Sequence, residues 1–86
     1  MEYDKKTIDR LKRLEGQIRG VLRMVEEGKE CRDVVTQLSA SRSAINRVMG
    51  LIISQNLESC VRDNIAQGSG TEDAVREAVD LLVKSM

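Results

Sequence analysis

The chain has 86 residues, with 14 Lys and Arg against 14 Asp and Glu, so its formal net charge is zero. It has no histidine, proline, tryptophan or phenylalanine, and Tyr3 is its one aromatic residue, which excludes an aromatic core. This length forms one domain at most, so we expect residues 1–86 to be a single domain. Because such a short chain buries only a modest core by itself, we also expect an oligomer.

The first expected element is a helix over about Asp4 to Glu27. Apolar residues recur there at heptad spacing, flanked by two more: Ile8, Leu11, Ile18, Leu22 and Val25, with Leu14 and Val21 beside them. Asp4 or Thr7 can cap its start, and Gly28 is a suitable stop. The period predicts an amphipathic helix.

The second expected helix runs from about Cys31 to Asn64, and small residues cluster within it in "SASRSA". It would span roughly 50 Å at the usual helical rise, which a monomer of this size does not cover. The loop "AQGSGT" then leads to a third helix, about Thr71 to Ser85, with Thr71 as a possible cap. The expected fold is therefore all-α with three helices, stabilised by a partner chain.

Charge is unevenly spread along the chain. Residues 1–62 carry twelve Lys and Arg and nine Asp and Glu, a net charge of +3, whereas residues 63–86 carry two and five, a net charge of −3. This imbalance fits ordinary solvated helix faces, and it equally fits a basic surface for a polyanion.

The two cysteines, Cys31 and Cys60, share one face of the second helix, since 29 helical steps bring them within about 20° of each other. They are nevertheless separated by roughly 43 Å along the axis, and a disulfide needs Cα atoms within about 7 Å. If the helix pairs antiparallel with its copy, Cys31 of one chain faces Cys60 of its partner, and the two-fold axis forms the site twice.

Three interpretations of these cysteines are open. Each can be a small buried apolar residue. They can be reactive thiols, because Cys31 begins a helix beside Lys29 and Arg32, which favours the thiolate form of a cysteine. They can also bind Cu(I), which accepts two soft ligands, although Asn56 is a poor third ligand.

No signal peptide and no apolar run of membrane-spanning length is present, so we expect a cytoplasmic protein without a membrane partner. In the cytosol, paired cysteines favour chemistry over a structural disulfide. An enzyme is not expected, because the chain has no catalytic constellation beyond its thiols.

The runs "RLKRLEGQIRG", "CRDVVTQLSA" and "NLESCV" resemble the copper- and nickel-sensing repressors of the CsoR/RcnR family over nearly the whole chain. The resemblance implies an antiparallel four-helix-bundle dimer core, a homotetramer built as a dimer of dimers, and binding of double-stranded operator DNA without a helix-turn-helix. Arg10 and Arg47 match positions that the family uses for DNA contact. Other basic residues could extend that surface: Arg13, Arg19 and Lys12.

The chain departs from the family at the sensing site. Copper sensors of the family have Cys, His and Cys where this chain has Cys31, Asn56 and Cys60. Its nickel and cobalt sensors need several histidines, and the sequence is most similar to the persulfide-sensing CstR-like branch. The resulting prediction is a repressor without metal or cofactor that senses persulfide or polysulfide through an intersubunit cysteine pair and releases DNA on crosslinking. The alternatives are a Cu(I) sensor using the two thiolates, and a helical oligomerisation module with inert cysteines.

Overall fold

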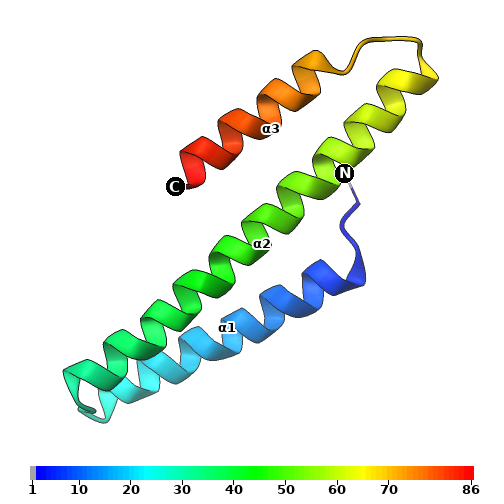
Figure 1. Ribbon diagram of the computed structural model, residues 1–86. Helices are drawn as coiled ribbons and strands as arrows, with labels where there is room; N and C mark the ends of the chain where they lie inside the picture. Colours follow the sequence, from blue (N-terminus) through cyan, green and yellow to red (C-terminus); the bar gives the residue numbers. More distant parts are fainter. Residues whose placement is uncertain (1) are drawn as a thin grey trace. The chain divides into compact units, whose positions relative to one another are not determined.

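The computed structural model describes residues 2–86, which form three α-helices and no strand (Figure 1). These are α1 (Lys5–Glu26), α2 (Cys31–Ala66) and α3 (Glu72–Ser85). The predicted all-α class is confirmed. Within the described residues, no helix is both long and apolar enough to cross a membrane.

Local capping sets the bounds of α1. The Asp4 carboxylate accepts the backbone N–H of Thr7 at 2.8 Å and the Thr7 hydroxyl at 2.7 Å. At the other end, Gly28 has a φ of 71°, a left-handed conformation that glycine adopts without the steric cost of a Cβ. Of the two predicted caps, the structure therefore selects Asp4, and it confirms Gly28 as the stop.

Helix α2 has 36 residues and extends two residues beyond its predicted end at Asn64. Gly68, with a φ of 73°, follows it. Thr71 occupies the N-cap position of α3, as expected, but its side chain makes no capping hydrogen bond. The first turn of α3 instead carries Glu72 and Asp73, whose negative charges suit the positive end of a helix dipole.

The chain divides into two compact units, and the first comprises Asp4–Val48. In this unit α1 runs antiparallel to the first part of α2 (Figure 1). Its buried and half-buried residues follow mostly three-, four- and seven-residue spacing on both helices: Thr7, Arg10, Leu14, Gly20, Val21 and Met24 on α1, and Val34, Ser41, Ala44 and Val48 on α2. Ser41, from the predicted cluster of small residues, is only 2% exposed. The heptad stripe of α1 instead points away, with Leu22 and Val25 each 58% exposed.

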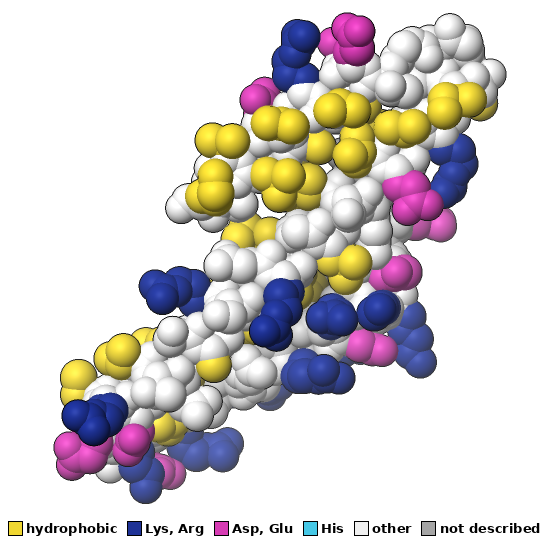
Figure 2. Space-filling model, viewed as in Figure 1, with side chains coloured by type: hydrophobic (Ala, Val, Ile, Leu, Met, Phe, Trp, Pro, Cys, Tyr) yellow, Lys and Arg dark blue, Asp and Glu magenta, His cyan; other side chains and the backbone are white. Residues whose placement is uncertain are grey.

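The second unit contains Met49–Met86, in which α3 lies along the last part of α2. Its buried side chains are Ala74 and Ala78, one helical turn apart. Larger residues of α3 stay exposed, including Val75, Val79 and Leu82. Figure 2 shows apolar side chains gathered over this unit. These uncovered apolar faces fit the expected oligomer, which stays a prediction.

Candidate functional site

Cys31 is the first residue of α2 and is exposed. The Glu30 carbonyl accepts the N–H groups of Asp33 at 3.0 Å and Val34 at 3.1 Å, so α2 begins directly after Glu30. Cys31 thus lies in the first helical turn, where backbone N–H groups lack intrahelical partners and the helix dipole is positive. Its sulfur is open to reagents arriving from solvent.

The charges around Cys31 are mixed. Lys29 Nζ lies 3.8 Å from Glu27 Oε2, and both side chains are about half exposed. Such exposed pairs contribute about 0–1 kcal/mol. In the sequence, the acidic Glu30 directly precedes Cys31, Arg32 directly follows it, and the acidic Asp33 lies two residues after it. Glu27 therefore partly neutralises the charge of Lys29. Arg32 is the cation closest to Cys31 in the sequence.

Cys60 lies on the later part of α2 and is half-buried. Its thiol donates a long hydrogen bond of 4.0 Å to Asn56 Oδ1, one turn earlier in the helix. The structure thus places the predicted neighbour Asn56 beside Cys60, with its amide oxygen directed at the thiol. A sulfhydryl donor makes only a weak hydrogen bond, so this contact orients the pair without fixing it tightly.

Both thiols are free, and they lie 29 residues apart in one continuous helix. That spacing prevents a disulfide within one chain, because a disulfide needs Cα atoms within about 7 Å. Among residues 2–86 of a single chain, no group of three or more His, Cys, Asp or Glu residues is placed to hold a metal ion.

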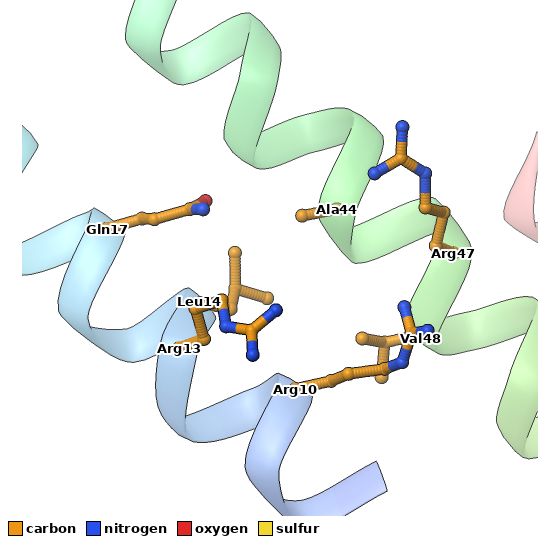
Figure 3. Close-up of a pocket in the computed structure, with 7 residues that line it drawn as sticks. All are labelled: Arg10, Arg13, Leu14, Gln17, Ala44, Arg47 and Val48. Carbon is orange, nitrogen blue, oxygen red and sulfur yellow. The ribbon is translucent and has the colours of Figure 1, made fainter. Parts of the chain in front are cut away.

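A basic cavity of about 130 Å³ opens within the first unit, between α1 and α2 (Figure 3). Its polar wall has Arg10, Arg13 and Gln17 from α1, and Arg47 from α2. Its remaining wall is apolar and consists of Leu14, Ala44 and Val48. In Figure 3 the side chains of Arg10, Arg13 and Gln17 reach from α1 toward α2. The fold thereby places Arg10 and Arg47 in the lining of one cavity, although they are 37 positions apart in the sequence.

The other two predicted DNA-contact residues lie outside this cavity. Arg19 forms an exposed ion pair with Glu15 at 3.2 Å. Lys12 lines a separate shallow hollow with Ile8, Leu11 and Glu15. Gln17 was not among the predicted site residues. Its position, four residues after Arg13 and therefore on the same helical face, is the sequence signal that could have found it.

The protein is all-α, with two thiols on one helix and a basic cavity between two helices, which is the electrostatic pattern of a DNA-binding regulator. Residues 3–84 match the family described as "Metal-sensitive transcriptional repressor", and the chain belongs to this family. The predicted family is thereby confirmed, and its members are repressors, not enzymes.

Two proteins of known sequence are similar to this chain over most of its length. The chain is 64% identical over 62 residues to the uncharacterized protein YrkD of Bacillus subtilis, covering 72% of this chain and 98% of YrkD. It is 44% identical over 70 residues to the copper-sensing transcriptional repressor RicR of Mycobacterium tuberculosis, covering 80% of this chain and 73% of RicR.

Two solved structures share the fold. The nickel-responsive transcriptional regulator InrS superposes with a TM-score of 0.78 at 35% identity, covering 99% of this chain and 94% of InrS. The copper-sensing repressor CsoR with Cu(I), from Geobacillus thermodenitrificans, gives a TM-score of 0.78 at 34% identity, covering 98% of this chain and 91% of CsoR.

Proposed function

We propose that this chain, acting as one domain, is a repressor of the CstR-like branch that senses persulfides or polysulfides through Cys31 and Cys60. One observation carries the proposal. Where the family's copper sensors have histidine, this chain has Asn56, whose oxygen accepts the Cys60 thiol, in a sequence with no histidine. Two thiols without a nitrogen ligand suit sulfur exchange better than a three-coordinate metal site.

The chemistry requires a sulfane-sulfur donor, written RSSH. The exposed Cys31 thiolate attacks its outer sulfur, which breaks the S–S bond of the donor, forms a Cys31 persulfide and releases RSH. Cys60 of the partner chain then attacks the inner sulfur of this persulfide, forming the Cys31–Cys60 disulfide and releasing H₂S. The two thiols are oxidised by two electrons, and the transferred sulfur is reduced to sulfide.

The assembly that permits this step is an antiparallel pairing of α2 with α2 of a second chain. This pairing supports two symmetric Cys31–Cys60 sites, and a dimer of such dimers gives the expected homotetramer. The exposed apolar stripe of α1 and the exposed residues Leu38 and Ile45 of α2 supply surface for such contacts.

Operator DNA is the proposed second partner, with Arg10 and Arg47 as its principal contacts. Arg13 shares their cavity, and Arg19 and Lys12 stay as proposed contacts on the same helix. Arginines bind backbone phosphates strongly, so DNA affinity should fall steeply with salt. Crosslinking lowers DNA affinity by stabilising an arrangement of α2 that binds DNA less well, a coupling typically worth 1–3 kcal/mol, or 5–150-fold.

The decisive experiment is intact mass spectrometry under non-reducing conditions after treatment with polysulfide, beside matched peroxide and Cu(I) treatments. The expected product is a crosslinked dimer in the polysulfide arm, with loss of binding to duplex DNA selected from a random pool. Reductant should restore both the monomer mass and DNA binding. Polysulfide treatment that leaves the chains uncrosslinked and DNA-bound would refute sulfur sensing.

Cu(I) sensing through the two thiolates is a second candidate, favoured by the names of two relatives, the copper-sensing RicR and CsoR. The donor set suits Cu(I) in part, because two soft thiolates are acceptable at low coordination number. If stoichiometric Cu(I) releases DNA while polysulfide does not, copper is the inducer. If neither acts and Cys31→Ser and Cys60→Ser change nothing, the chain is an oligomerisation module with inert cysteines.

A further inference from the structure

The basic cavity of the first unit has an unusual balance of charge. Three guanidinium groups, of Arg10, Arg13 and Arg47, line a space of about 130 Å³ that no carboxylate lines. Ion pairs among residues 2–86 involve other cations, namely Arg19, Lys29 and Arg62. No carboxylate in the lining of this cavity offsets the repulsion among the three arginines, so the cavity attracts an anion.

The size of the cavity restricts what it can hold. Pockets for drug-sized ligands usually measure about 300–1,000 Å³, so 130 Å³ suits a group of a few atoms. Planar guanidinium groups present paired N–H donors that match the oxygens of phosphate. The Gln17 side-chain amide adds two further donors on the same wall. Several N–H donors around a small space whose lining has no carboxylate meet the requirements for binding a tetrahedral oxyanion.

A second cavity adjoins the first along α1. It shares Arg10 and Arg13 with the first and adds Lys5, Lys6 and one carboxylate, Asp9. Arg10 and Arg13 therefore line both cationic cavities, and of these two only the first has no acidic residue in its lining. Figure 2 shows the basic side chains concentrated on the part of the molecule that contains α1.

We propose that the cavity of Arg10, Arg13, Gln17 and Arg47 is a discrete site for one phosphate group. This proposal rests on the proposed function, because the physiological occupant of the site is a phosphodiester of the DNA backbone. Free inorganic phosphate has the same chemistry and binds the site more weakly. The site fixes the register of the protein on DNA through one clamped phosphate, and Arg13 and Gln17 act in it beside Arg10 and Arg47.

The first test titrates inorganic phosphate into the DNA-free protein and follows the side-chain Nε–H signals of arginine by NMR, with sodium chloride at matched ionic strength as the reference. Signals of Arg10, Arg13 and Arg47 should shift saturably with phosphate, at about millimolar concentrations, and not with chloride. Arg13→Gln should weaken phosphate binding by about tenfold or more. Arg13→Lys should weaken it by less, because lysine keeps the charge but loses the paired donors.

Arg23→Gln is the matched control, since Arg23 is an exposed arginine of the same helix that does not line the cavity and has no proposed DNA contact. It should leave phosphate affinity unchanged. Shifts that are linear, equal in chloride, or unaffected by Arg13→Gln would overturn the proposal.

A second experiment distinguishes a DNA phosphodiester from free phosphate as the occupant, and tests the phosphate site and the proposed function separately. Phosphate should displace selected duplex DNA more effectively than chloride at equal ionic strength, and Arg13→Gln should remove that difference. Saturable phosphate binding by a chain that binds no DNA would contradict the proposed function and keep the site as one for free oxyanions. DNA binding without saturable phosphate binding would overturn the site and keep the proposed function.

Discussion

At the scale of single residues, the side chain at position 56 separates the two candidate inducers. The Asn56 oxygen lies 4.0 Å from the Cys60 sulfur, one turn away in α2. An amide oxygen is a hard and weak ligand for Cu(I), whereas imidazole suits copper well. The chain therefore has two soft donors and lacks the nitrogen donor that would complete a copper site.

Asn56→His should supply that donor. We expect Cu(I) affinity to rise by at least about tenfold, since even outer-sphere partners of a metal typically change affinity by 10–100-fold. Competition with a calibrated Cu(I) chelator measures this directly, with Gln55→His as a control one position away on the helix. Tight Cu(I) binding by the unchanged chain, with no gain from Asn56→His, would favour copper as the natural inducer.

The two thiols should behave differently when separated by mutation. In Cys60→Ser, polysulfide should leave sulfur added to Cys31 on single chains, because the exposed thiol reacts and its resolving partner is missing. In Cys31→Ser, the half-buried Cys60 should gain several-fold less sulfur in the same time. Non-reducing mass spectrometry scores both variants, and extensive crosslinking of Cys60→Ser would exclude Cys60 as the resolving thiol.

At the scale of helices, sequence reasoning succeeded where interactions are local. The cap at Asp4, the stop at Gly28 and the long α2 follow from residues within one or two turns of each helix end. It did not find which face of α1 packs against α2. The expected heptad stripe of Ile8 and its successors is exposed, and a row containing the polar Thr7 is buried instead.

Asp4→Ala should destabilise α1 by about 1–2 kcal/mol, because the N–H and hydroxyl of the buried Thr7 both lose the Asp4 acceptor. Thermal unfolding followed by circular dichroism at fixed protein concentration measures the loss. Asp4→Asn keeps an oxygen acceptor at the cap and should stay close to the parent stability. Equal losses in both variants would show that the negative charge matters more than the hydrogen bonds.

At the scale of the whole molecule, the proposed dimer has a defined register. If Cys31 faces Cys60 of an antiparallel partner, the two-fold axis crosses α2 midway between these positions, between Ile45 and Asn46. Ile45 is apolar yet 39% exposed in one chain, as expected of a residue awaiting a partner. Its own copy would lie about 1.5 Å away along the helix axis.

Ile45→Cys, made in a chain carrying Cys31→Ser and Cys60→Ser, should therefore form an intersubunit disulfide under mild oxidation. Ser43→Cys in the same background is the control, since its copy is displaced by about 7.5 Å along the axis and it lies on another face. Non-reducing electrophoresis gives the yield of each. Equal yields, or a solution mass of 9.6 kDa by light scattering, would contradict the antiparallel dimer.

The sequence by itself determined the three helices, the family and the placement of two thiols on one helix, because helical period, capping and motif spacing are local properties of the chain. The tertiary structure decided which side chains meet. Thr7 and Val21 of α1 and Ser41 and Val48 of α2 are the buried side chains of the first unit. The packing of these two helices places Arg10, Arg13 and Arg47 around one cavity. Such convergence depends on the fit of two surfaces distant in sequence, which no local pattern encodes.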